Sequence, residues 1–301
     1  MTFCFEKIKN IPIAITGLLL AILSLGNLYN NMPIKYVTFS LGLIIILVMI
    51  TKCIFFRDIM KEELNQLVPL STSGTFSMAL MVLSTYVVIY NYILALILWG
   101  IGVILHSLII VIFTYRHVLN NFNIEDVYGS YWIVYIGITM ASITGLFLNI
   151  QNYSWIFFIF GFIMMIPTFS LVTYRYIFYP VKLEQNKPLI CIYAAIFNIL
   201  IVGYVNSFDV INYYFLIALY LTASICYVFS LYKLINLIRL PFYPSYSAFT
   251  FPFVISAIAS AMMLMIFEYE ILNYIVVFET VIATVMVIYV LIGYIQNYLI
   301  N

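Results

Sequence analysis

The chain has 301 residues, of which 66% are hydrophobic and only 8% are charged, and its formal net charge is +1. Soluble domains carry about 25% charged residues, so the composition excludes a water-soluble globular protein and indicates an integral membrane protein. The four cysteines show no C-x-x-C spacing and no neighbouring histidines, so neither a metal nor a redox site is predicted.

Ten segments are long and apolar enough to cross a bilayer, which takes about 20 residues. We therefore expect an all-α integral membrane protein with ten transmembrane helices and a single transmembrane domain over residues 1–301. In chain order, the predicted spans cover roughly residues 11–30, 36–56, 71–89, 92–115, 131–150, 154–177, 189–207, 210–236, 246–267 and 271–298.

The connections between these spans alternate in length. Those that follow odd-numbered spans are very short, such as NYS at 152–154 and SFD at 207–209. Those that follow even-numbered spans are longer and polar, such as RDIMKEELNQLVP at 57–69. This alternation predicts five helical hairpins.

Charge predicts the orientation, because loops on the cytoplasmic side collect Lys and Arg. Of the twelve basic residues only Lys35 lies on the opposite side of the predicted topology. Both termini are therefore expected in the cytoplasm of a multi-pass protein of the cell membrane. The other basic residues are Lys7, Lys9, Lys52, Arg57, Lys61, Arg116, Arg175, Lys182, Lys187, Lys233 and Arg239.

The hairpins have nearly constant length. Matched positions early in the odd spans are Pro12, Ser77, Gly137, Ala195 and Pro252, with spacings of 65, 60, 58 and 57 residues. Similar hairpins repeated in this way predict a quasi-symmetric ring around a central pore lined by the odd spans. Proline in a spanning helix removes a hydrogen bond, so kinks are expected at Pro12 and Pro252.

Small and weakly polar residues recur on the odd spans. On any one helix they are explained by ordinary helix packing, in which small side chains let backbones approach. Their recurrence on all five odd spans favours a shared aqueous path. The predicted pore-lining residues are Thr16, Gly17, Ser77, Thr139, Ser142, Asn198 and Ser256.

Two ionisable residues fall inside spans. Glu279 is a candidate for proton or substrate coupling, against a purely structural or subunit-contact role, and His106 is expected to be a packing residue. The chain contains no H-E-x-x-H, G-x-S-x-G or phosphate-binding glycine loop, so no enzyme activity and no cofactor are predicted. The near-zero net charge gives no indication of a nucleic-acid partner.

Three stretches resemble one known family. They are IPIAITGLLLAILSLGNLY at 11–29, GTFSMALMVLSTYV at 74–87 and SAFTFPFVISAIASA at 247–261. They are similar to the tellurite-resistance/dicarboxylate transporter family, which includes bacterial TehA and the slow anion channel of plant guard cells. The resemblance implies ten helices in five hairpins, a homotrimer with one pore per subunit, and a phenylalanine plug at Phe251.

The sequence departs from the family pattern where prolines are expected in the third, fifth and seventh spans. Ser77 stands at the first of these positions, and Gly137 and Ala195 lie near the other two, so fewer kinks are expected.

Our leading hypothesis is a plasma-membrane channel or transporter for small inorganic or organic anions, closed by Phe251. The alternative is a proton-coupled exporter of C4-dicarboxylate, sulfite or tellurite-type anions. A non-transporting membrane scaffold or sensor is a third possibility, which the lack of a sizeable soluble segment disfavours.

Overall fold

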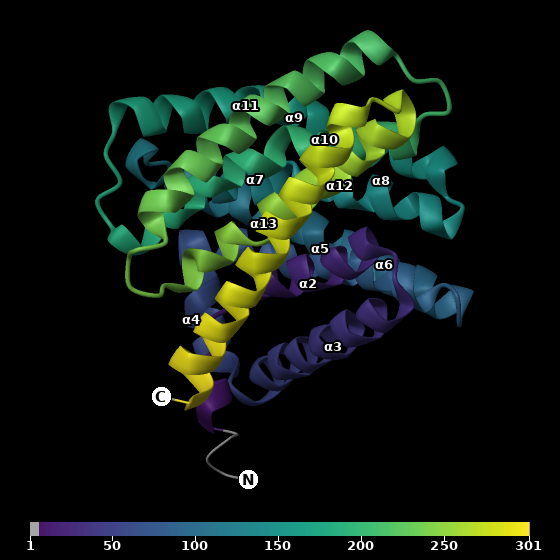
Figure 1. Cartoon of the computed structure of the whole chain (residues 1–301). Helices are drawn as coiled ribbons and strands as arrows, with labels where there is room; N and C mark the ends of the chain where they lie inside the picture. The colour runs from purple at the N-terminus through teal and green to yellow at the C-terminus, as the bar shows by residue number, and fades with distance from the viewer. Residues whose placement is uncertain (1–5, 301) are drawn as a thin grey trace.

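The computed structural model describes residues 6–300 and is all-helical within that range. Successive helices pack in pairs, as expected for hairpins, and a short helix, α4, joins the first two pairs (Figure 1). The pairs are α2 (Ile15–Tyr29) with α3 (Met32–Phe55); α5 (Leu67–Val87) with α6 (Tyr92–Phe113); α7 (Ser130–Tyr135) and α8 (Met140–Gly145) with α9 (Gln151–Phe178); α10 (Tyr193–Ser207) with α11 (Tyr213–Leu237); and α12 (Phe251–Phe267) with α13 (Glu270–Tyr294), while α4 spans Arg57–Asn65.

The predicted all-α membrane fold is confirmed. Within residues 6–300, nine helical segments are long and apolar enough to span a bilayer. The α-helical part of the first predicted span is shorter than expected: α2 has 15 residues and begins at Ile15, because the chain forms turns at Ile13 and Ala14. The segment Ile11–Ala14 therefore leads into α2 as non-helical chain.

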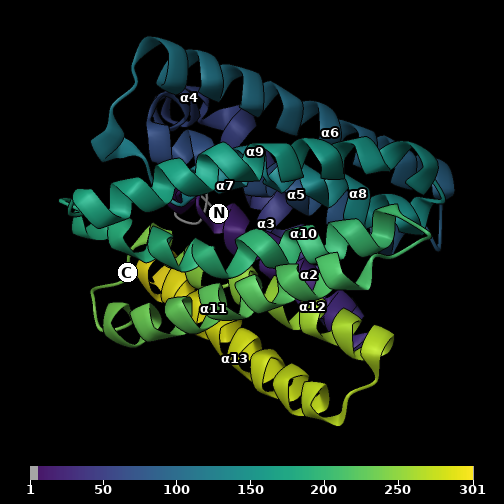
Figure 2. The ribbon, with the colours of Figure 1, turned by 90° about the horizontal axis from the view of Figure 1, so that it is seen from above.

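Burial separates the helices into two sets. In the odd-numbered spans from α5 onward, 67–89% of the most apolar window is buried, against 17–33% in the even-numbered spans. We call α2, α5, α7, α8, α10 and α12 the inner helices, and α3, α6, α9, α11 and α13 the outer helices. Figures 1 and 2 show α3, α6, α11 and α13 at the periphery of the molecule.

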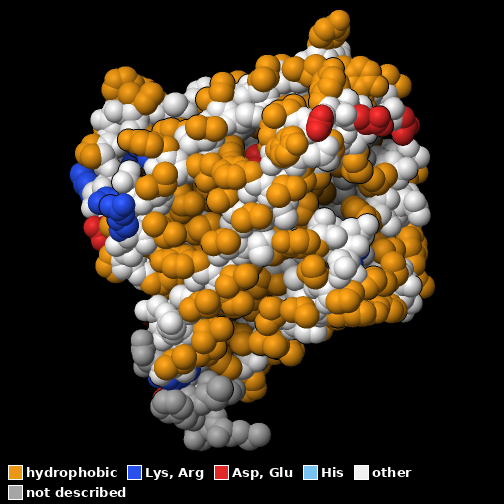
Figure 3. Space-filling view, viewed as in Figure 1, with side chains coloured by type: hydrophobic (Ala, Val, Ile, Leu, Met, Phe, Trp, Pro, Cys, Tyr) orange, Lys and Arg blue, Asp and Glu red, His pale blue; other side chains and the backbone are white. Residues whose placement is uncertain are grey.

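The inner helices form a closed ring. They contact one another in chain order, from α2 to α5, then α7 and α8, then α10 and α12, and α12 contacts α2 again. The outer helices present apolar side chains to the surroundings, as the largely hydrophobic surface in Figure 3 shows. Such a surface suits contact with lipid. Because lipid offers no hydrogen-bonding groups, the backbone polar groups must pair within the protein, as they do in helices.

The inner helices are interrupted more often than the prolines alone predict. A tight turn at Gly137–Thr139 separates α7 from α8 without any proline. The segment Glu184–Ile192 leads into α10 as a tighter 3₁₀ helix, and Pro244–Phe249 does the same before α12. The helix α5 is continuous over its 21 residues, in agreement with the missing proline at Ser77.

The distortion expected at Pro252 is a break and not a bend within one helix. Thr250, with φ −107° and ψ −82°, ends the 3₁₀ segment and precedes α12. Pro252 therefore sits in the first turn of α12, where its missing N–H leaves no helical hydrogen bond unmade. Phe251 is therefore the first residue of a new helix, so the direction of its side chain depends on α12 and not on the 3₁₀ segment before it.

Candidate pore and gate

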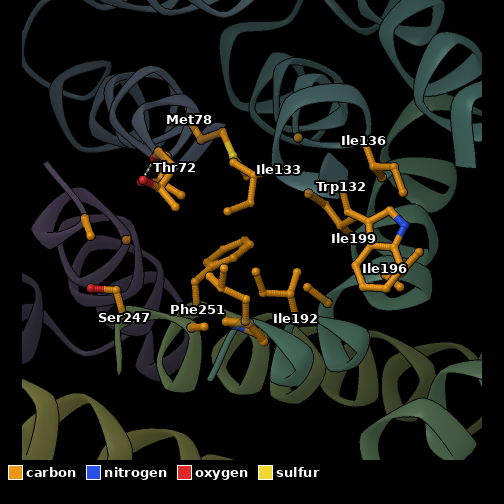
Figure 4. Close-up of a pocket in the computed structure, with 18 of the residues that line it drawn as sticks. Thr72, Met78, Trp132, Ile133, Ile136, Ile192, Ile196, Ile199, Ser247 and Phe251 are labelled. Carbon is orange, nitrogen blue, oxygen red and sulfur yellow. Dashed lines mark hydrogen bonds between the residues drawn. The ribbon is translucent and has the colours of Figure 1, made fainter. Parts of the chain in front are cut away.

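A small cavity lies at the centre of the ring (Figure 4). Its volume is about 60 Å³, which has room for only a few water molecules. Each lining residue belongs to an inner helix or to the segment that leads into one, and all five hairpins contribute. The lining consists of Ala14, Gly17, Thr72, Thr75, Met78, Trp132, Ile133, Ile136, Gly137, Leu189, Ile192, Ala195, Ile196, Ile199, Ser245, Ser247, Ala248, Phe251 and Pro252.

The ring of Phe251 projects into this cavity from α12, towards the side where Met78 and Ile133 lie (Figure 4). The break before α12 sets this direction. The hydroxyl of Thr250 donates to the Ser247 carbonyl at 2.7 Å and lies 3.4 Å from the Gly17 carbonyl of α2. A Cβ at Gly17 would lie 2.9 Å from the Ser247 Cβ, so glycine allows the close approach of these two segments.

The lining of the central cavity is largely apolar and carries no charged residue. Its hydroxyl groups already have partners inside the protein: Thr75 donates to the Thr72 carbonyl at 2.7 Å, Thr72 donates to the Val68 carbonyl at 2.9 Å, and the Ser247 hydroxyl lies 2.8 Å from that of Tyr294. An ion that entered this space would lose its water without gaining compensating hydrogen bonds, which is strongly unfavourable.

A wider cavity of about 500 Å³ adjoins the central one at the end where the inner helices begin. We call it the vestibule. The two cavities share Ala14, Thr72 and Ser245 in their linings. The vestibule is more polar than the central cavity, and its polar side chains are Glu63, Gln66, Thr72, Asp126, Tyr128, Gln185, Asn186 and Ser245. The two spaces therefore lie next to each other, and Phe251 lines only the smaller one.

The comparison with known families agrees with this arrangement. Residues 10–295 match the family described as Voltage-dependent anion channel. The chain belongs to the voltage-dependent anion channel family. The resemblance to the tellurite-resistance/dicarboxylate transporter family, to which these channels belong, is thereby confirmed. A search of curated proteins found no match. The family assigns the chain to membrane proteins that conduct or transport anions.

In this anion channel family member, the structure places four of the sequence-predicted site residues along the two cavities. Phe251, Pro252 and Gly17 line the central cavity, and Pro12 lines the vestibule. Pro12 lies in the non-helical segment before α2. The role of Phe251 as a gate stays a prediction.

The other predicted pore-lining residues are buried outside the lining of the central cavity. Thr16 pairs with Thr75 at 2.7 Å between their hydroxyl oxygens, which joins α2 to α5. Asn198 donates from Nδ2 to the Ser256 hydroxyl at 2.8 Å, which joins α10 to α12. Ser77 lies 2.7 Å from Nδ1 of His106. These contacts hold inner helices to their neighbours, and a pore-lining role for these residues stays a prediction.

Thr139 and Ser142 lie where the third hairpin meets α10. A Cβ added to Gly203 would lie 2.4 Å from the Thr139 methyl group and 3.3 Å from the Ser142 hydroxyl. The Ser142 hydroxyl donates to the Thr139 carbonyl at 2.7 Å, whereas the buried Thr139 hydroxyl has no hydrogen-bond partner within the described part of the chain. Both side chains therefore contact helix backbones across the interface.

Glu279 lies on the outer helix α13 and is 6% exposed. Its carboxyl group faces Ser260 of α12, whose hydroxyl lies 3.0 Å from that of Tyr220 on α11. One carboxyl oxygen, Oε2, is buried and has no hydrogen-bond partner among the residues that the structure describes. Glu279 does not line the central cavity or the vestibule. A coupling role therefore stays a prediction.

The apolar part of the lining, such as Met78, Trp132 and Ile133, was not predicted. Small and polar side chains stand out in an apolar helix, whereas isoleucine or tryptophan in a membrane helix gives no signal of its own. The signal that the sequence did carry is the set of matched positions in the odd spans, since Gly137, Ala195 and Pro252 all line the central cavity.

Proposed function

We propose that this protein is an anion channel of the cell membrane, with its pore along the axis of the inner helices and with Phe251 as the gate. The observation that carries the proposal is the central cavity: all five hairpins line it, and the Phe251 ring projects into it (Figure 4). A hydrophobic constriction of this kind blocks ions by keeping the passage dry.

Opening requires little rearrangement. Rotation of one side chain, or a small shift of the first turn of α12, moves the ring off the axis. The break at Thr250 supports this, because the first turn of α12 is not held by a continuous helix before it. The apolar lining has no fixed charge that would hold an ion tightly, and weak binding favours rapid passage.

The proposal includes a setting in the membrane. Both termini lie in the cytoplasm, which the placement of all but one of the basic residues supports. The vestibule then faces the cytoplasm, since it lies at the end where the inner helices begin. The protein acts as a homotrimer with one pore in each subunit, as the family resemblance implies. Its substrates are small inorganic or organic anions.

The test is the anion conductance of purified protein in planar bilayers. We expect Phe251→Ala to raise it by about tenfold or more, because each tenfold corresponds to only about 1.36 kcal/mol of barrier. Phe251→Trp, which keeps the passage filled, is expected to stay closed. An Ala variant that is monodisperse yet conducts no better than the parent protein would contradict the gate.

Phe253→Ala is the matched control. Phe253 is also on α12 and fully buried, but its ring packs against Tyr227 with the centroids 5.6 Å apart, outside the cavity lining. Both variants lose a buried ring, at a cost of about 3–5 kcal/mol in stability. We expect the control to lower stability and leave conductance at the parent level. Increased current in both variants would indicate general loosening and not an opened gate.

A second candidate function is proton-coupled export of a C4-dicarboxylate, sulfite or tellurite-type anion. The buried Oε2 of Glu279, which has no partner, favours it, since buried intramembrane acids often mark proton pathways. The same bilayers decide between the two. In a channel the reversal potential follows the anion gradient alone. In a coupled carrier it shifts with the pH gradient, and Glu279→Gln abolishes that shift.

A further inference from the structure

Arg175 is a buried charge that has no acidic partner among residues 6–300. It lies in the last turn of α9 and is 1% exposed. Its Nε and Nη2 donate to the Glu125 carbonyl at 3.2 and 2.7 Å, and Nη1 donates to the Tyr179 carbonyl at 3.4 Å. Among residues 6–300, no carboxylate lies within 4.0 Å of it. Carbonyl groups satisfy the N–H donors but leave the positive charge uncancelled.

This guanidinium lies directly behind the vestibule wall. Its central carbon is 4.7 Å from the centroid of the Tyr128 ring, and Tyr128 lines the vestibule. The ring of Tyr176 flanks the same carbon at 5.2 Å. Asp126, which follows the Glu125 carbonyl in sequence, also lines the vestibule. One layer of side chains therefore separates the charge from the vestibule.

The other charges around the vestibule are compensated or exposed. Glu63 is paired with Lys52 at 2.6 Å, and Glu125 is paired with Lys182. Asp126 is exposed, and its Oδ2 accepts a hydrogen bond from Asn123. Water and salt screen an exposed charge strongly, whereas the field of a buried charge passes through a medium of low dielectric constant. The unscreened part of the local field is therefore that of Arg175.

We propose that Arg175 attracts small anions from solution into the vestibule and so raises their concentration in front of the Phe251 constriction. This inference rests on the proposed channel function. The lining of the central cavity holds no charged residue, and Arg175 supplies the positive charge that acts on the anion. Because Tyr128 covers the guanidinium, the charge attracts anions without binding them directly. Attraction without capture favours throughput, since a conducting site must also release its ion.

The competing explanation is purely structural: Arg175 ties α9 to the segment around Glu125. Two variants separate the explanations. Arg175→Met and Arg175→Lys both lose the forked hydrogen bonds, but only the lysine keeps the charge. A structural role therefore predicts similar defects in both variants. An electrostatic role predicts a defect in the methionine variant alone.

The experiment measures chloride conductance in the Phe251→Ala background at about 0.01 M and about 1 M salt, where the Debye length is about 30 Å and about 3 Å. We expect Arg175→Met to lower the low-salt conductance about three- to tenfold, at the modest end of electrostatic focusing, with little effect at high salt. Arg175→Lys is expected to stay near the parent. Equal conductance of the methionine variant and the parent at low salt would overturn the inference.

Two further variants keep the test decisive if Arg175→Met does not fold. Arg175→Gln also removes the charge but keeps a side-chain N–H donor for the Glu125 carbonyl, and it is expected to lower the low-salt conductance as the methionine variant does; a value equal to that of the parent overturns the inference. Arg239→Gln removes an exposed charge outside the cavity linings and is expected to change nothing. If the Phe251→Ala parent itself carries no anion current, the proposed channel function fails, and the inference fails with it.

Discussion

At the scale of single residues, the polar side chains of the inner helices contribute to packing more than their pattern suggests. Thr139 is the clearest example. A Cβ added to Gly161 of the outer helix α9 would lie 2.1 Å from the Thr139 hydroxyl oxygen. The absence of a side chain at Gly161 therefore leaves room for this hydroxyl. Thr139 faces α9 and does not line the central cavity.

This geometry gives a prediction that separates packing from pore lining. Gly161→Ala is expected to destabilise the protein by about 1–3 kcal/mol, because it overpacks the interface. Thr139→Ala removes the obstructing oxygen, so the double variant is expected to recover most of the loss. Thermal unfolding of the four proteins in detergent measures both effects.

Thr139→Ala alone, in the Phe251→Ala background, is expected to leave anion conductance and selectivity unchanged. A changed permeability ratio between two anions would show instead that Thr139 lines the conducting path.

At the scale of helices, the sequence predicted the order in which the helices pair but not the interruption of an inner helix at Gly137. The alternating connections predicted the hairpins, because a short link holds consecutive helices together whatever their side chains are. The break at Gly137 was not predictable, since no proline marks it and His106, which packs beside it, comes from α6. The Nε2 of His106 lies 3.1 Å from the Val134 carbonyl near the break, and its Nδ1 lies 2.7 Å from the Ser77 hydroxyl. Only the folded chain shows that these three residues meet.

The vestibule could not be predicted for the same reason. Its wall combines Glu63 from α4, Asp126 and Tyr128 from the segment before α7, and Gln185 from the segment before α10. These segments lie far apart in the sequence and none has a periodic pattern. The family resemblance predicted the position of Phe251 in the ninth span, but the direction of its ring depends on the break at Thr250.

The short helix α4 holds the start of α2 in place. Lys52 of α3 is fully buried and donates to Glu63 of α4 and to the Ile11 carbonyl, both at 2.6 Å. The second oxygen of Glu63 accepts the Ile13 N–H at 3.2 Å. The non-helical segment Ile11–Ala14 contributes to both cavities, so this ion pair supports the walls of both.

We expect Glu63→Ala to lower the stability by roughly 3 kcal/mol, the low end for breaking a buried ion pair, because the Glu63 side chain is 23% exposed. The loss arises because Lys52 stays buried without its acid. The double variant Lys52→Met/Glu63→Ala is expected to be more stable than Glu63→Ala alone. Thermal unfolding in detergent tests this order, and the reverse order would contradict a desolvated lysine as the cause.

At the scale of the whole molecule, charge is distributed unequally between the two ends. Figure 3 shows Lys and Arg side chains gathered at one end of the visible face, with acidic side chains beside them, whereas only acidic side chains are seen at the opposite end. The described part of the chain begins and ends on the same side of the molecule, since Lys7 donates to the Leu299 carbonyl at 2.8 Å. Basic loops remain in the cytoplasm during insertion, so this asymmetry predicts that the vestibule faces the cytoplasm.

Single cysteines test that orientation in a variant whose native cysteines are replaced by alanine. Asn31 is exposed in the turn between α2 and α3, and Asn121 is exposed beyond α6 at the opposite end. Asn31→Cys is expected to react with a membrane-impermeant maleimide added to intact cells, and Asn121→Cys only after permeabilisation. The opposite labelling pattern would invert the topology.

The orientation also determines from which side the salt dependence is seen. If the vestibule faces the cytoplasm, Arg175 attracts anions that arrive from that side, and the conductance should respond mainly to ionic strength there. Lowering salt only on the cytoplasmic face should therefore reproduce the difference between the parent and Arg175→Met, whereas lowering it only outside should not. Cysteine labelling and the salt dependence of conductance thus measure the orientation of the protein in the membrane by independent means. Agreement between them would show that the vestibule faces the side on which the basic residues lie.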